Sequence, residues 1–178
     1  KVILFDPENI KAISFIKGEN TIILKRIGTD EWQMTAPVNA NGDAPAVSDF
    51  LSFLKNLNFT RVVEESPKDL TSFGLDTPDL KIILSMNNGE TKGVRVGDDH
   101  PMGNKVYLAR LNEDRVLTAG ITKNRLDRKV HDLRDKTILD FKTPQITKIE
   151  LIRNGKTLSL KKNKASWEVS EEKITAKG

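Results

Sequence analysis

The sequence of 178 residues contains no cysteine. Thiol nucleophiles, cysteine-based zinc sites, iron–sulfur clusters and disulfide frameworks are therefore excluded, although the redox compartment stays open because a cysteine-free chain suits either one. The sequence also lacks any apolar run near the roughly 18 residues that a membrane-spanning helix needs. Its first residue is Lys1 and not methionine, which leaves room for an N-terminal anchor upstream.

Motifs for nucleotide binding and for common hydrolases are also missing. No G-x-G-x-x-G occurs, and Gly155-Lys156-Thr157 lacks the earlier glycine of a phosphate-binding loop. No G-x-S-x-G elbow occurs, and only His100 and His131 could serve as the base of a Ser-His-Asp arrangement. The sequence therefore identifies no catalytic residue and predicts no cofactor.

One polar cluster has the chemistry of a metal site or an acid–base pair. Asp98, Asp99 and His100 are consecutive in the segment from Gly97 to Asn104, and carboxylates with an imidazole can bind divalent cations. Neighbouring side chains on an extended loop diverge, so we interpret the segment as a solvated hairpin loop and keep these three residues as metal candidates only. A metal-dependent hydrolase that uses this loop is the alternative function from the enzyme class.

Positive charge is concentrated in the C-terminal third. Residues 1–120 carry 14 basic and 17 acidic side chains, whereas residues 121–178 carry 15 basic and 8 acidic ones. The cations alternate with apolar residues, which is typical of the solvated face of a sheet, so no nucleic-acid partner is expected. Binding of an anionic polymer or lipid by the C-terminal hairpin stays open, through Arg153, Lys156, Lys161, Lys162 and Lys164.

The most informative feature is an internal duplication, because a repeated pattern indicates a repeated supersecondary unit. Residues 10–26, followed by Trp32, resemble residues 146–162, followed by Trp167, at an offset of 136 that falls to 135 at the tryptophans. In each copy apolar residues recur at every second position on both sides of a glycine-containing turn, which predicts a β-hairpin. We predict that Trp32 and Trp167 lie on a third strand and anchor a core.

Three helices are predicted. Asp43 can cap the first, in which Phe50 and Leu54 belong to a helically spaced apolar stripe and act as core anchors. A capping residue, a proline at the first position and a closing glycine predict a short helix over residues 66–74. Apolar residues at helical spacing predict the last helix over residues 122–133.

The region between the helices reads as strands. Four short apolar runs separated by turn residues predict an antiparallel meander over residues 80–117. Strands grouped in this way, and not alternating with helices, define an α+β fold with antiparallel sheets. We expect two domains: residues 1–145 form a first repeat, and residues 146–178 begin a second repeat that is truncated where its helix would start.

Several segments are distinctive beyond their local structure: Trp32 with Ala36-Pro37, the string from Pro67 through Phe73-Gly74-Leu75 to Pro78, Val96-Gly97, and Val106 to Arg110. Together they resemble the bacterial domain-of-unknown-function family 4340 over about Phe5 to Phe141. The proline-to-proline string is the most specific part of this resemblance.

The resemblance implies a cellular location and an association with particular membrane systems. Such proteins are extracytoplasmic, in the periplasm or at the cell surface, with an N-terminal membrane tether and further repeats, and are often encoded near ABC-type transport or gliding-motility components. The resemblance offers no catalytic residues to carry over. We therefore expect a non-catalytic interaction or scaffold module with protein partners in a membrane complex, and its oligomeric state is open.

Overall fold

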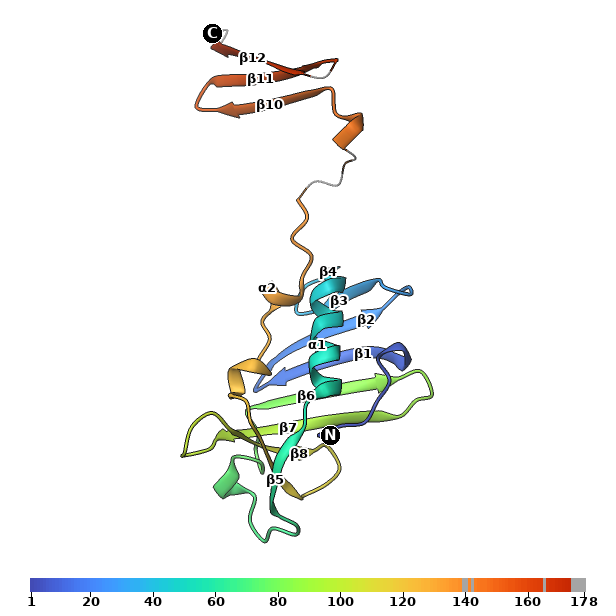
Figure 1. The fold of residues 1–178 in the computed structure, drawn as a ribbon, viewed down its shortest axis with the longest axis vertical. Helices are drawn as coiled ribbons and strands as arrows, with labels where there is room; N and C mark the ends of the chain where they lie inside the picture. Colours follow the sequence, from blue (N-terminus) through green and yellow to red (C-terminus); the bar gives the residue numbers. More distant parts are fainter. Residues whose placement is uncertain (139–140, 142, 165, 174–178) are drawn as a thin grey trace. The chain divides into compact units, whose positions relative to one another are not determined.

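A computed structural model describes residues 1–138, 141, 143–164 and 166–173 of the chain (Figure 1). Of residues 171–173 it describes the backbone alone. The chain forms two compact units, Lys1–Lys136 and Thr137–Gly178. The second unit holds residues 137–145 in addition to the predicted second hairpin. That this unit begins another repeat stays a prediction.

Unit 1 is built on one nine-stranded antiparallel sheet. Its strand order is β4-β3-β2-β1-β6-β7-β8-β9-β5, in which the predicted meander forms the run from β6 to β9. The strands are β1 (Ile10–Lys17), β2 (Asn20–Arg26), β3 (Trp32–Ala36), β4 (Ala40–Asn41), β5 (Phe59–Glu64), β6 (Leu80–Met86), β7 (Thr91–Asp99), β8 (Val106–Arg110) and β9 (Val116–Ala119).

One helix, α1 (Ala44–Asn56), packs on the face of this sheet (Figure 1). The Asp43 carboxylate accepts a hydrogen bond from the backbone N–H of Ala46 at 3.0 Å, which supplies the predicted cap. Phe50 and Leu54 are fully buried in the core, and the rings of Phe50 and Phe15 lie 5.0 Å apart between centroids. Trp32 joins the same core with 4% of its side chain exposed.

The prediction of a helix over residues 66–74 is wrong. Only a 3-10 turn, η2 (Thr71–Phe73), forms there, and Gly74 ends it with a φ of 65°. The reason is local: the Asp69 carboxylate accepts hydrogen bonds from the Thr71 N–H at 2.8 Å and the Ser72 hydroxyl at 3.1 Å. Such side-chain turns compete with the helical hydrogen-bond pattern.

The predicted helix over residues 122–133 is divided in two. A 3-10 turn, η3 (Lys123–Arg125), is followed by extended backbone at Lys129 and then by the short helix α2 (Val130–Leu133). Asp127, at the break, is held by an ion pair with Lys17 of β1. This long-range contact takes the place of helix continuation, although the predicted apolar positions Leu126 and Leu133 are still buried.

Two further 3-10 turns and three strands complete the described chain. The turns are η1 (Pro7–Asn9) in unit 1 and η4 (Thr143–Gln145) in unit 2, and the strands form a three-stranded antiparallel sheet in unit 2. The strands of that sheet are β10 (Lys148–Arg153), β11 (Lys156–Asn163) and β12 (Ser166–Lys173). Asn154 and Gly155 join β10 to β11, and both have the positive φ angles that such a hairpin turn requires.

The duplication extends to the pairing registers of the strands. The two hairpins pair in the same register at the offset of 136, through Ile13/Leu24 with Phe15/Ile22 and through Ile149/Leu160 with Leu151/Leu158. Each tryptophan lies on the third strand, directly opposite a basic residue of the second strand. Trp32 is opposite Arg26, and Trp167 is opposite Lys162. The α+β class and the duplicated hairpin with its tryptophan-bearing strand are therefore confirmed.

Trp167 departs from its predicted role as a core anchor. Its side chain is 39% exposed, ten times the exposed fraction of Trp32. The described part of unit 2 contains no helix that could correspond to α1. The tryptophan has the same register in both copies, but among the residues that the structure describes it is enclosed only in the first copy.

Candidate functional site

The metal candidates at the end of β7 do not converge. Asp99 accepts a hydrogen bond from the backbone N–H of Lys123 at 3.0 Å, and His100 accepts one on Nδ1 from the backbone N–H of Met102 at 3.1 Å. The Asp98 carboxylate lies against Gly74. Among the residues that the structure describes, no group of three or more His, Cys, Asp or Glu could hold a metal ion.

An arginine beside Trp32 was missed by the sequence analysis. The Arg26 guanidinium lies 4.6 Å from the centre of the Trp32 ring and donates hydrogen bonds to the backbone carbonyls of Ile10, Thr29 and Pro7. It therefore joins three segments and covers the indole face. The sequence could have indicated this contact through the position of Arg26 at the end of the predicted hairpin, next to the strand that carries Trp32.

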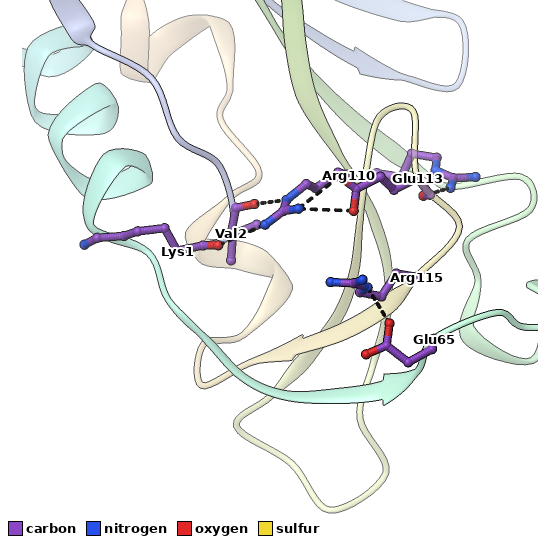
Figure 2. Close-up of polar contacts among 7 residues, drawn as sticks. Lys1, Val2, Glu65, Arg110, Glu113 and Arg115 are labelled. Carbon is purple, nitrogen blue, oxygen red and sulfur yellow. Dashed lines mark hydrogen bonds and ion pairs between the residues drawn. The ribbon is translucent and has the colours of Figure 1, made fainter.

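A second missed arginine ties down the N-terminal segment (Figure 2). Arg110 of β8 donates to the backbone carbonyls of Val2 at 2.7 Å and Lys1 at 3.4 Å, and it forms an ion pair with Glu113 at 2.9 Å. A small cleft of about 290 Å³ lies beside this network. Because the Arg110 guanidinium is already engaged by the two carbonyls and Glu113, we interpret the network as structural.

A larger groove of about 460 Å³ lies where the β1–β2 turn meets the segment before α2. Phe15, Ile22 and Leu80 contribute apolar surface to it. The ion pair between Lys17 and Asp127, with Nζ and Oδ2 at 2.5 Å, stands at its rim. The groove has apolar walls and charged edges, and at its rim the acid and the base are already paired with each other.

The ion pair at this rim makes the stability of unit 1 depend on pH. The hydrogen bond from Lys17 to Asp127, helped by the carboxylate charge, raises the pKa of the Lys17 ammonium above its ordinary value in spite of partial desolvation. A raised pKa of a cation stabilises the fold below its unfolded pKa of about 10.4, and this stabilisation is lost as the pH rises through the folded pKa.

We therefore expect Lys17→Met to lower the free energy of unfolding by less than about 1 kcal/mol at pH 7, because the pair is partly exposed. The difference from the unmodified protein should shrink above pH 10.5 or so. Urea denaturation at a series of pH values measures it, and Lys11→Met, an exposed position on the same strand, is the control. A gap that stays constant up to the highest pH would contradict this assignment.

Several exposed apolar side chains lie together on one face of the sheet in unit 2. This apolar face is formed by alternate residues of the three strands: Ile149, Leu151, Leu158, Leu160, Trp167 and Val169. Leu151 and Val169 are 58% and 64% exposed. Of the equivalent residues in unit 1, five are buried in its core and one, Ile22, is partly buried against it; the five are Ile13, Phe15, Leu24, Trp32 and Met34.

The basic residues of the C-terminal hairpin do not form one patch. Arg153 and Lys156 are opposite each other in the strand register at one end of the apolar face. Lys162 is opposite Trp167 at the other end. Lys161 alternates with Lys162 and so points to the opposite face, while Lys164 lies in a turn with a φ of 55°. Three of the five cations therefore border the apolar face.

The structure thus defines an α+β protein of two units, of which the second exposes the apolar face of a duplicated hairpin. Residues 32–177 match the family described as Domain of unknown function (DUF4340), and the chain belongs to this family. The match includes the second hairpin, whereas the resemblance in the sequence was placed over about Phe5 to Phe141. Neither a curated protein nor a solved structure gave a match.

Membership of this family does not by itself assign the protein to a cellular compartment. In the part of the chain that the structure describes, no helix is long and apolar enough to cross a membrane. The positions that carried the resemblance have structural roles: Gly74 has a positive φ at the end of η2, and Trp32 is buried. The candidate functional site is therefore the apolar face of unit 2.

Proposed function

We propose that the chain is a non-catalytic interaction module of an extracytoplasmic, membrane-associated assembly in bacteria. The observation that supports this function is the exposed apolar face of the β10–β11–β12 sheet. Contiguous exposed apolar surface with a polar border is typical of protein interaction sites. Its partners in this proposal are protein components of a membrane complex.

The proposed location rests on the resemblance of the sequence to membrane-tethered extracytoplasmic proteins. In this proposal the full-length protein carries an N-terminal tether, and the module serves as an accessory to an ABC-type transport or gliding-motility system. Unit 1 supplies a stable scaffold through its buried sheet and helix, and unit 2 supplies the docking surface.

Affinity capture of the tagged full-length protein from bacterial membranes tests the function. We expect a transporter or envelope component to be recovered with the unmodified protein and to be lost with Val169→Asp, which places a charge on the apolar face. Ile152→Asp is the matched control, because Ile152 is 68% exposed on the opposite face of the same sheet. Recovery of no such component above background would overturn the proposal.

A further inference from the structure

The sulfur chemistry of this chain falls entirely on its three methionines, because the sequence contains no cysteine. Met34 of β3 is fully buried and Met86 of β6 is 7% exposed, so both thioethers belong to the core of unit 1. Met102 is 85% exposed. A two-electron oxidant converts methionine to its sulfoxide where it can reach the sulfur. Accessibility therefore distinguishes one of the three methionines.

Met102 lies in the turn that joins β7 to β8. The backbone of this turn is held by hydrogen bonds from the His100 N–H to the Lys105 carbonyl and from the Gly103 N–H to the His100 carbonyl, both at 2.8 Å. The Met102 N–H donates to Nδ1 of His100 at 3.1 Å. None of these bonds involves the Met102 side chain. The thioether can therefore change chemically while the turn keeps its conformation.

We propose that Met102 is a site of reversible oxidation by hydrogen peroxide. A lone pair of Sδ attacks one peroxide oxygen, so that the S–O bond forms as the O–O bond breaks. The departing hydroxide takes the proton from the transferred oxygen and leaves as water, and the sulfur gives up the two electrons that reduce the peroxide. A methionine sulfoxide reductase reverses the change: two thiols become a disulfide, and the oxygen leaves as water.

The two core methionines differ from Met102 in what a sulfoxide would cost. Met34 lies opposite Leu24 in the sheet, and a sulfoxide there would place a polar group in apolar surroundings, which is unfavourable without a hydrogen-bond donor. An oxidant can reach Met34 or Met86 only when the fold opens locally. At Met102 the sulfoxide oxygen stays in water. The turn therefore takes up oxygen without loss of stability and before the core is damaged.

Peroxide treatment of the full chain, followed by tryptic digestion and mass spectrometry, tests this assignment. The digest separates the methionines, because residues 27–55, 82–92 and 96–105 form peptides with one methionine each. We expect Met102 to gain one oxygen at least tenfold faster than Met34 or Met86, and the three rates to converge in urea. Methionine sulfoxide reductases of both epimer specificities, with dithiothreitol, should restore the original mass of the peptide 96–105.

Met102→Leu is the matched variant, because leucine keeps an apolar side chain of similar size and removes the sulfur. The variant should lose the fast oxidation. Its urea midpoint, and that of the unmodified protein oxidised at Met102 alone, should equal the midpoint of the untreated protein. Equal oxidation rates at the three methionines of the native protein, a lower midpoint after oxidation of Met102, or a sulfoxide that the reductases leave unchanged would each overturn the inference. The capture experiment tests the interaction function separately, since it makes no use of this turn.

Discussion

Replacing Trp32 by alanine is expected to destabilise unit 1 by about 3–5 kcal/mol, the usual cost of truncating a buried aromatic residue. The same replacement at Trp167 should cost less than about 1 kcal/mol, since only cross-strand contacts on an exposed face are lost. The two tryptophans share one sequence pattern and one register, but their exposed fractions are 4% and 39%. The comparison therefore measures what enclosure in a core adds to the contribution of the same tryptophan.

Several contacts would be lost with the indole of Trp32. Its side chain packs in the core and lies under the Arg26 guanidinium, which is 4.6 Å from the centre of the ring. Alanine would leave a cavity among these groups and remove the aromatic partner of the Arg26 guanidinium. Neither effect has a counterpart at Trp167.

Urea denaturation followed by far-UV circular dichroism measures both changes. Fluorescence of single-tryptophan proteins adds an independent reading: emission from Trp32 in the Trp167→Phe variant should be blue-shifted relative to emission from Trp167 in the Trp32→Phe variant. Equal stability losses for the two alanine variants would contradict this prediction. That result would mean that Trp167 is enclosed in solution and that the apolar face is already covered.

The parts of the fold that the sequence predicts are those with local signals. The Asn154-Gly155 turn and the alternation around it define the second hairpin, because the turn requires positive φ and the strands need one apolar face. The first helix is predicted by the Asp43 cap and the stripe that contains Phe50 and Leu54. In both cases the residues that carry the signal also make the contacts.

The parts that the sequence mispredicts depend on distant partners. Asp127 could have continued a helix, but its ion pair with Lys17, a residue more than a hundred positions away, holds the chain in another conformation. Arg110 reads as an ordinary polar residue of a strand, and nothing near it in the sequence points to the carbonyl of Val2. Local pattern gives no access to such pairs.

The candidate site, the apolar face of unit 2, could be predicted from the sequence only in part. Alternation correctly places Trp167 and Val169 on one apolar face, and the structure confirms the register. Alternation gives the side of the sheet that needs cover, but it carries no information about which element covers it. Exposure of the apolar face therefore had to come from the structure, and so did the distribution of Arg153, Lys156 and Lys162 around it.

Alanine at Gly97 is expected to lower the free energy of unfolding of unit 1 by about 3 kcal/mol, at the upper end of the usual cost of overpacking. Gly97 lies in β7, where an added Cβ would meet the backbone carbonyl oxygen of Phe73 at 2.1 Å and the Leu75 side chain at 3.0 Å. The carbonyl belongs to the backbone of η2, so no side-chain rotation can relieve the clash.

The expected consequence is a separation of η2 from the sheet. Leu75, fully buried behind the turn, and the edge-to-face contact of Phe73 with Tyr107 at 5.1 Å would both be weakened. Gly120→Ala is the matched control, because its added Cβ meets only the Thr60 methyl group at 3.5 Å and its φ is not in the left-handed region. Alanine there should be neutral or should stabilise by up to about 1 kcal/mol.

Thermal and urea denaturation of the two glycine variants decide between a tight backbone approach and a general need for chain flexibility. If only Gly97→Ala loses stability, the close contact of β7 with η2 is required, and Pro67-to-Pro78, the most distinctive string of the sequence, is explained as the segment that seats this turn on the sheet. If the two variants lose the same stability, backbone freedom and not the Phe73 carbonyl is the reason for glycine, and this account of the string is wrong.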